Sequence, residues 1–295
     1  MAQIKANDIT LEYEDYGDER APPILLIMGL GAQLTLWPME LVEALTERGF
    51  RVIRYDNRDI GLSEKFDSAG VPSIPLTVLK ARFGLKPRVP YTLSDMAADA
   101  VGLLDALDIR KAHIVGASMG GMIAQLVAVE HAERTASLTS IMSTTGHRRL
   151  PQAEKGALAA LTARPKNTEM PNILAHGKRL SRAIGSPAYP AAEDRLEQNI
   201  RANFERSFHP QGLPRQLAAI LADGDRRERL ADVKAPTLVL HGEADPLVKV
   251  EAGRDTAAHI PGAELKIIPG MGHDLPVELV EEIADAVAAH ARKAA

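Results

Sequence analysis

The sequence predicts an α/β fold: a mostly parallel central sheet flanked by helices, with an inserted helical lid. Short apolar runs alternate with helical segments before residue 143 and after residue 235, which is typical of a parallel sheet covered by helices on both faces. Between these two parts, helical segments separated by prolines replace the strands. We therefore expect a core domain of residues 1–143 and 235–295 and a helical cap of residues 144–234.

Composition narrows the class of protein. The chain has 295 residues, 45% of them hydrophobic and 25% charged, as in ordinary globular proteins. Its net charge of −4 gives no electrostatic reason to expect a nucleic acid or an anionic membrane surface as a partner. The lack of cysteine excludes a cysteine nucleophile, thiolate metal sites and disulfides. The N-terminus lacks the apolar core of a signal peptide and no apolar run approaches membrane-spanning length, so we expect a cytoplasmic protein.

The strands are predicted from short apolar runs. In chain order these runs cover residues 9–16, 24–28, 51–55, 112–115, 137–143, 237–241 and 265–268. The run at 9–16 alternates apolar and polar residues, which predicts a strand near a sheet edge, whereas continuous apolar runs predict central strands. In such a sheet, ligands bind beyond the carboxyl ends of the strands.

The helices are predicted from their periodicity and their end signals. In chain order they cover residues 41–48, 76–83, 92–107, 121–130, 152–162, 171–184, 191–208, 213–221 and 277–289. The helix at 92–107 starts with a capping residue. The short helix at 76–83 lies within a proline-marked connection, residues 66–90, that is unusually long for a compact domain.

The motif Gly116-Ala117-Ser118-Met119-Gly120 stands between a predicted buried strand and a predicted helix. Strand, sharp turn and helix are the context of a nucleophile elbow. Glycine is needed two positions before and two positions after the turning residue, because side chains there would clash. We expect Ser118 in a strained conformation with its hydroxyl exposed above the sheet, as the nucleophile.

A serine hydroxyl needs a base, and His273 in a glycine-rich loop after the last strand is the candidate. Its imidazole needs an acceptor, for which Asp245 directly follows another strand, with Glu243 as the nearest competitor. The other histidines are expected to pack or to lie at the surface. His113 is expected to pack, whereas His131, His176, His209, His259 and His290 are expected at the surface.

An oxyanion hole needs two N–H donors. The Met119 N–H lies at the start of a helix, where N–H groups lack partners, and the turn Gly29-Leu30-Gly31 presents the Leu30 N–H. That turn is a weak match to a dinucleotide-binding loop, because the third glycine is missing. Gly29 and Trp37 are the candidates for substrate contact, with packing beneath the pocket as the equal alternative for Trp37.

Asp56 and Arg58 follow the strand at 51–55 and offer a carboxylate and a guanidinium group. Such a pair fits a catalytic site, but more often it fixes one loop to its neighbours. We expect the structural role.

Taken together, these motifs resemble the α/β-hydrolase superfamily over nearly the whole chain, and most closely its esterase and non-haem haloperoxidase-like branch, which includes methylesterases that tailor aromatic polyketides. The resemblance implies Ser118 as nucleophile, His273 as general base and then acid, Asp245 as its orienting acid, and Leu30 and Met119 as oxyanion donors. Two departures matter. Most relatives have His-Gly where this chain has Met28-Gly29. Epoxide hydrolases and haloalkane dehalogenases have aspartate in place of the serine, so those activities are disfavoured.

The expected function is hydrolysis of a carboxylic ester or lactone through an acyl-enzyme, on a small, mainly apolar substrate. The alternatives are carbon–carbon bond hydrolysis or perhydrolysis on the same residues, a receptor-like protein with little turnover, and a scaffold with a vestigial site. No metal and no organic cofactor is expected, because no histidine pair has metal-ligand spacing beside a carboxylate. The oligomeric state is not readable from the sequence.

Overall fold

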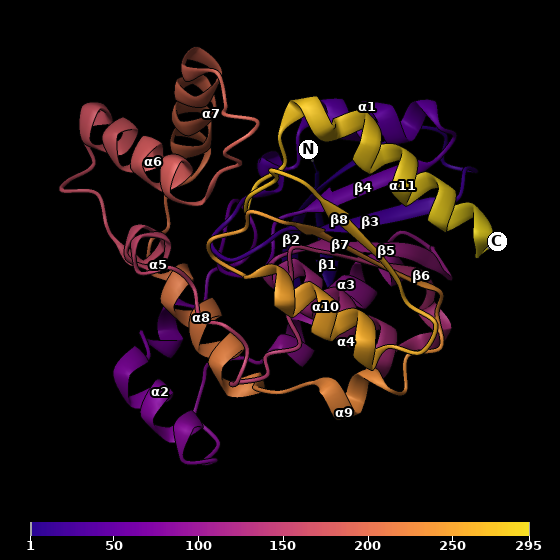
Figure 1. Ribbon diagram of the computed structural model, residues 1–295, viewed down its shortest axis with the longest axis horizontal. Helices are drawn as coiled ribbons and strands as arrows, with labels where there is room; N and C mark the ends of the chain where they lie inside the picture. Colours follow the sequence, from indigo (N-terminus) through magenta and orange to yellow (C-terminus); the bar gives the residue numbers. More distant parts are fainter. Residues whose placement is uncertain (1, 295) are drawn as a thin grey trace.

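The fold is described by a computed structural model that covers residues 2–294. Its centre is an eight-stranded sheet with the strand order β1-β2-β4-β3-β5-β6-β7-β8 (Figure 1). The strands are β1 Ala2–Ala6, β2 Ile9–Tyr16, β3 Pro23–Ile27, β4 Arg51–Tyr55, β5 Ala112–Ala117, β6 Thr135–Ile141, β7 Thr237–Gly242 and β8 Glu264–Ile268. β2 pairs antiparallel with β1 and with β4, and the remaining pairs are parallel. The predicted fold class is confirmed.

Successive side chains of the central strands point to opposite faces of the sheet, so these strands build two apolar cores, one on each face. In β3, Leu25 and Ile27 belong to one apolar cluster, whereas Ile24 and Leu26 belong to the other. The first cluster is covered by α3 Leu93–Ala106 and α4 Met119–Glu130, and the second by α1 Met39–Glu47 and α11 Val280–Lys293. Burial on both faces explains why these strands are continuous apolar runs in the sequence.

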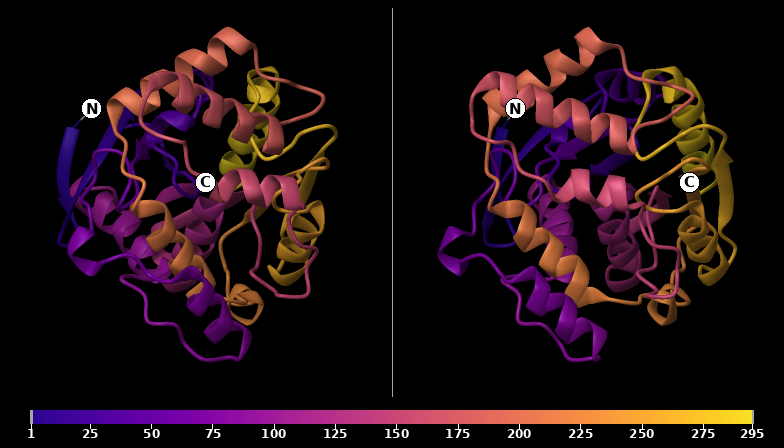
Figure 2. Two further views of the ribbon diagram at one scale, coloured as in Figure 1. Left: turned by 90° about the vertical axis from the view of Figure 1, so that its left-hand side faces the viewer. Right: turned by 60° about the vertical axis from the view of Figure 1, so that its left-hand side comes forward.

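Helices α5 to α8 lie together on one side of the sheet (Figures 1 and 2). Their bounds are α5 Lys155–Thr162, α6 Met170–Ile184, α7 Glu193–Arg206 and α8 Gly212–Asp223. Gly177 lets α6 approach α7 closely, because a Cβ atom there would lie 2.6 Å from Ile200 Cδ1. These helices fall within the segment that we predict as the cap. The remaining helices are α2 Ile74–Arg82, α9 Arg227–Leu230 and α10 Val250–His259.

Among the strands and α-helices, three were not predicted: β1, α10 and the short helix α9. β1 has no apolar run, since only its last residue, Ala6, is buried, and it joins the sheet edge through its backbone pairing with β2. β2, expected near an edge, is therefore second from it. α10 connects β7 to β8, and a crossover of this kind is required between neighbouring parallel strands.

Two further expectations concern the burial of histidine side chains and membrane-spanning helices. His113 is buried as predicted, but the prediction that His290 lies at the surface is wrong, because His290 is buried on the inner face of α11 and its Nε2 lies 3.1 Å from the Pro236 carbonyl oxygen. None of the helices between residues 2 and 294 is long and apolar enough to cross a membrane.

Candidate active site

The turn between β5 and α4 has the geometry that the glycine pattern predicts. Ser118 has φ 57° and ψ −120°, in the left-handed half of backbone space that a non-glycine residue rarely adopts. A Cβ atom at Gly116 would lie 2.1 Å from the Gly120 carbonyl oxygen, and one at Gly120 would lie 1.9 Å from the Ile27 carbonyl oxygen. No other residue type fits at these two positions. The strain at Ser118 is therefore built into the sheet-to-helix turn.

Hydrogen bonds from β6 and the loop after it hold this strained turn. The Ser118 N–H donates to the Ile141 carbonyl at 2.9 Å, and the Ser143 hydroxyl donates to the Ser118 carbonyl at 2.8 Å. Ser143 was not identified as a site residue from the sequence, where it is simply the end of an apolar run.

Ser118, His273 and Asp245 form a continuous hydrogen-bonded row, which we call the triad. His273 Nε2 lies 2.9 Å from Ser118 Oγ, and His273 Nδ1 lies 2.7 Å from Asp245 Oδ2. When Nδ1–H donates to the carboxylate, Nε2 is left to accept the serine proton. The competing carboxylate, Glu243, is exposed and takes no part in the row.

Asp245 is buried but remains a strong acceptor. Its Oδ1 accepts the N–H groups of Leu247 and Val248, each at 2.8 Å. Burial alone raises the pKa of Asp245, but the charge of His273 and hydrogen bonds from His241, His273 and the Val248 N–H outweigh burial and hold that pKa well below its ordinary value. Asp245 therefore faces the imidazole as an ionised carboxylate.

His241 is a second imidazole beside this carboxylate, and the sequence reading overlooked it. Its Nε2 lies 2.7 Å from the Val248 carbonyl oxygen and 3.5 Å from Asp245 Oδ2. Gly253 in α10 makes room for its ring, since a Cβ atom there would lie 2.5 Å from His241 Nδ1. The signal available in the sequence was a polar residue at the end of an apolar strand.

The turn at residues 29–31 lies directly against the serine. A Cβ atom at Gly29 would lie 3.0 Å from Ser118 Cβ, so glycine permits this approach. Within residues 2–294 the N–H groups of Leu30 and Met119 donate no hydrogen bond, which leaves both available to a ligand. Their joint role as an oxyanion hole remains a prediction.

Two long-range hydrogen bonds fix that turn, and neither partner was anticipated. The Asn57 side chain donates to the Met28 carbonyl at 2.9 Å, and Gln216 of α8 accepts the Gly31 N–H at 2.8 Å. This chain therefore holds the turn from two neighbouring segments.

The end of α6 holds the His273 loop. The His273 N–H donates to the Ile184 carbonyl at 2.7 Å, and the Gly272 N–H donates to the Ser186 hydroxyl at 2.8 Å. The same hydroxyl donates to Asp274, whose pKa burial raises. Ser186 was not recognised from the sequence, because its partners are far away along the chain. The position of His273 is thus coupled to the segment that we predict as the cap.

The remaining sequence candidates have structural roles. Trp37 is fully buried in the apolar cluster on the α1 and α11 face, so the structure favours packing over substrate contact. Asp56 and Arg58 do not pair with each other. Asp56 pairs with Arg206 at 2.7 Å, and Arg58 pairs with Asp99 at 2.6 Å.

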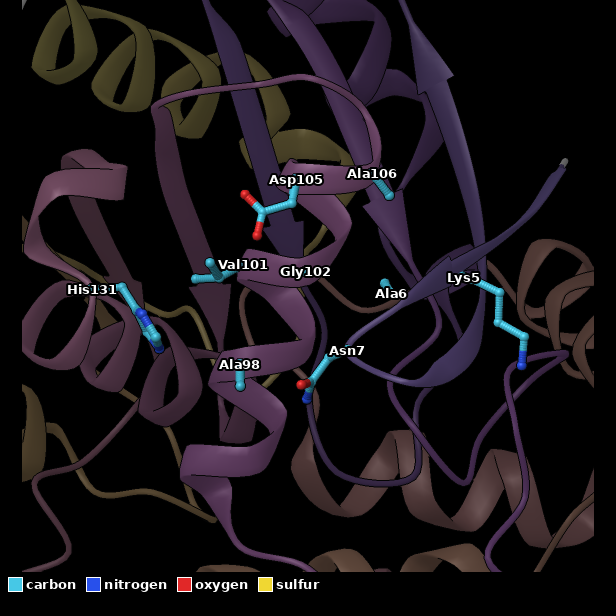
Figure 3. A pocket seen from close by; sticks show the side chains of 9 residues that line it. All are labelled: Lys5, Ala6, Asn7, Ala98, Val101, Gly102, Asp105, Ala106 and His131. Carbon is cyan, nitrogen blue, oxygen red and sulfur yellow. The ribbon is translucent and has the colours of Figure 1, made fainter.

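Outside the triad, the described residues offer no comparable site. Between residues 2 and 294 there is no group of three or more histidine, aspartate or glutamate side chains placed to hold a metal ion. An open groove of about 550 Å³ lies between the β1–β2 turn and α3 (Figure 3). Its polar lining residues are Lys5, Asn7, Asp105 and His131, and none of its lining residues belongs to the triad.

Comparison with known proteins agrees with this geometry. The family described as alpha/beta hydrolase fold matches residues 22–278. Rhodomycin D methylesterase DauP of Streptomyces sp. strain C5 is 31% identical over 99% of this chain and 98% of its own. The 3-oxoadipate enol-lactonase 1 of Acinetobacter baylyi is 27% identical over 88% of this chain and 85% of its own. The crystal structure of the enol-lactonase from Burkholderia xenovorans LB400 matches with a TM-score of 0.74 and 26% identity, covering 98% of this chain and 99% of that one.

Proposed function

The chain belongs to the α/β-hydrolase family, and from that premise we propose that it is a serine hydrolase that cleaves a carboxylic ester or lactone through an acyl-enzyme. The observation that carries the proposal is the row of two hydrogen bonds, 2.9 Å and 2.7 Å, that joins Ser118 through His273 to Asp245. In this proposal Ser118 is the nucleophile, His273 the general base and then acid, and Asp245 the group that orients the imidazole and stabilises its cation.

The reaction runs in two halves. His273 takes the proton of the Ser118 hydroxyl as its oxygen attacks the carbonyl carbon, and the N–H groups of Leu30 and Met119 stabilise the negative oxygen that forms. His273 then donates the proton to the leaving alcohol, and the ester bond breaks to give an acyl-serine. Water repeats the sequence, with the proton passing again through His273, and releases the acid.

The methylesterase and the enol-lactonase named above support an ester or a lactone as the substrate. The methylesterase and the enol-lactonase act, by their names, on a methyl ester and on an enol-lactone, and both reactions cleave an acyl carbon–oxygen bond. We therefore place this chain among the carboxylic ester hydrolases. The proposed substrate is a small, mainly apolar ester, the proposed location is the cytoplasm, and the mechanism requires no cofactor and no nucleic acid.

The experiment is hydrolysis of p-nitrophenyl esters from acetyl to long-chain acyl, with Ser118→Ala measured alongside. We expect turnover by the wild type and a loss of about 10⁴–10⁶-fold in the variant, with folding unchanged. Ser68→Ala, which removes an exposed hydroxyl in the loop before α2, is the matched control and should keep full activity. A wild type that hydrolyses none of the esters would move carbon–carbon bond hydrolysis or ligand binding ahead of ester hydrolysis.

A further inference from the structure

The connection between β4 and α3 gathers exposed apolar side chains to a degree seen nowhere else between residues 2 and 294. Phe83 is 71% exposed, Leu85 60% and Val71 53%, although large apolar side chains are ordinarily buried. Six of the large apolar residues that are exposed to solvent lie within residues 71–85 of this connection, and they are Val71, Leu76, Val78, Leu79, Phe83 and Leu85. An apolar patch of this kind marks an interaction surface.

Helix α2 carries much of this patch on its outer side. Leu76, Leu79 and Phe83 are spaced i, i+3 and i+7, so they lie along one face of the helix. The opposite face contains Thr77, which is buried, and α2 packs with that side toward α8. Figures 1 and 2 show α2 beside α8 at the periphery of the molecule, away from the sheet. The apolar stripe therefore points to solvent and not to the core.

The charge of the same segment is of one sign. Residues 71–94 contain Lys80, Arg82, Lys86 and Arg88 and no aspartate or glutamate, although the whole chain has a net charge of −4. Lys86 and Arg88 are exposed next to Leu85. The net charge thus hides a local basic surface that coincides with the exposed apolar side chains.

We infer that α2 and the loop after it, residues 71–88, dock the protein on the surface of an anionic lipid bilayer. Apolar side chains of this kind enter the boundary between headgroups and acyl chains, while flanking lysine and arginine side chains reach the anionic headgroups. A second copy of the chain fits less well, because two surfaces of the same positive sign repel each other. The inference does not depend on the proposed hydrolase activity.

Helix α8 links the docking segment to the candidate site. α2 packs on α8, and Gln216 of α8 accepts the Gly31 N–H of the turn beside Ser118. The helix that faces the lipid is therefore one element removed from that turn.

The test is co-sedimentation of the full chain with vesicles of phosphatidylcholine alone and with vesicles that contain phosphatidylglycerol. We expect binding to the anionic vesicles that exceeds binding to the neutral ones at low salt and weakens as salt screens the charges. The double variant Leu79→Asp with Phe83→Asp should bind at least about tenfold less. Lys86→Gln with Arg88→Gln should lose binding about thirtyfold on anionic vesicles only, at roughly 1 kcal/mol for each basic residue.

Leu265→Asp is the matched control, because Leu265 is an exposed apolar residue on the edge strand β8 and lies outside the segment 71–88. It should bind like the wild type, and thermal unfolding should be unchanged in every variant because the altered side chains are exposed. Two results would overturn the inference: no binding to either vesicle, or binding that the α2 variants leave intact. A wild-type dimer that Leu79→Asp with Phe83→Asp dissociates would assign the surface to a second copy and would equally overturn it. The same assays with Ser118→Ala separate docking from catalysis.

Discussion

Gly29 and Ser118 touch across the carboxyl edge of the sheet: a Cβ atom at position 29 would lie 3.0 Å from Ser118 Cβ and 3.3 Å from the Ala117 carbonyl oxygen. Both distances are tighter than side chains normally allow, and the serine turn is held by hydrogen bonds on its other side. The reacting hydroxyl and the turn that presents the Leu30 N–H therefore share one fixed geometry.

Gly29→Ala should lower turnover without unfolding the protein. The added methyl group pushes the turn and Ser118 apart by a few tenths of an ångström, and misplacement of reacting groups by about 1 Å costs on the order of 10²-fold. We expect kcat to fall about ten- to a hundredfold, measured on a p-nitrophenyl ester. Gly156→Ala is the control, since a Cβ atom at that helical glycine of α5 meets nothing within 4 Å and its activity should be unchanged. Equal activity of the two variants would contradict this account.

Arg206 at the end of α7 neutralises a carboxylate that has no access to water. Asp56 is fully buried, and it accepts the Leu34 N–H, the Leu62 N–H and the Arg206 guanidinium. Arg206→Met leaves the charge of Asp56 without a partner, which we expect to lower the free energy of unfolding by about 3 kcal/mol. Arg201→Met removes an exposed arginine from the same helix and should cost under about 0.5 kcal/mol. Urea unfolding measures both, and a loss below about 1 kcal/mol for Arg206→Met would refute the role of this pair.

His113 should make the protein less stable in mild acid. Burial, with the nearby charges of His290 and Lys111, lowers its pKa to about 4, whereas an imidazole in the unfolded chain has a pKa of about 6.5. Between these two pKa values the unfolded state binds more protons than the folded state. The contribution of His113 to the free energy of unfolding is therefore complete above about pH 6.5, and it falls by up to about 3 kcal/mol as the pH drops toward 4.

His113→Gln tests this directly, because glutamine does not titrate and can still bond to the Ser137 hydroxyl, which lies 2.9 Å from His113 Nδ1. Urea unfolding at pH 7 and at pH 4 should show a smaller difference for the variant than for the wild type. The variant keeps part of the pH dependence, because burial also lowers the pKa of His290. An identical pH dependence in the two proteins would show that His113 is not the responsible group.

Much of the fold was predictable because its signals are local. Continuous apolar runs mark strands that are buried on both faces, and β2 and β4 have the predicted bounds. The glycine pattern around Ser118 predicted a strained turn, since the clash that requires glycine is between positions four residues apart. β1 escaped prediction because an exposed edge strand needs no apolar side chains.

The surroundings of the triad were less predictable, because they depend on contacts between distant segments. Gln216 reaches the Gly31 N–H across 185 positions, and Ser186 reaches the Gly272 N–H across 86. Nothing local marks either residue. For Trp37 the sequence left packing and substrate contact equal, and only the complete burial of its side chain separates them.

The most direct test of the central claim is to locate the covalent adduct of an alkyl fluorophosphonate by peptide mass spectrometry. We predict one adduct, on Ser118, formed with loss of esterase activity, absent from Ser118→Ala and formed at least about a hundredfold more slowly in His273→Ala. An adduct on a different serine would contradict this prediction. A Ser118→Ala variant that is unlabelled but hydrolyses esters at the full rate would contradict it as well.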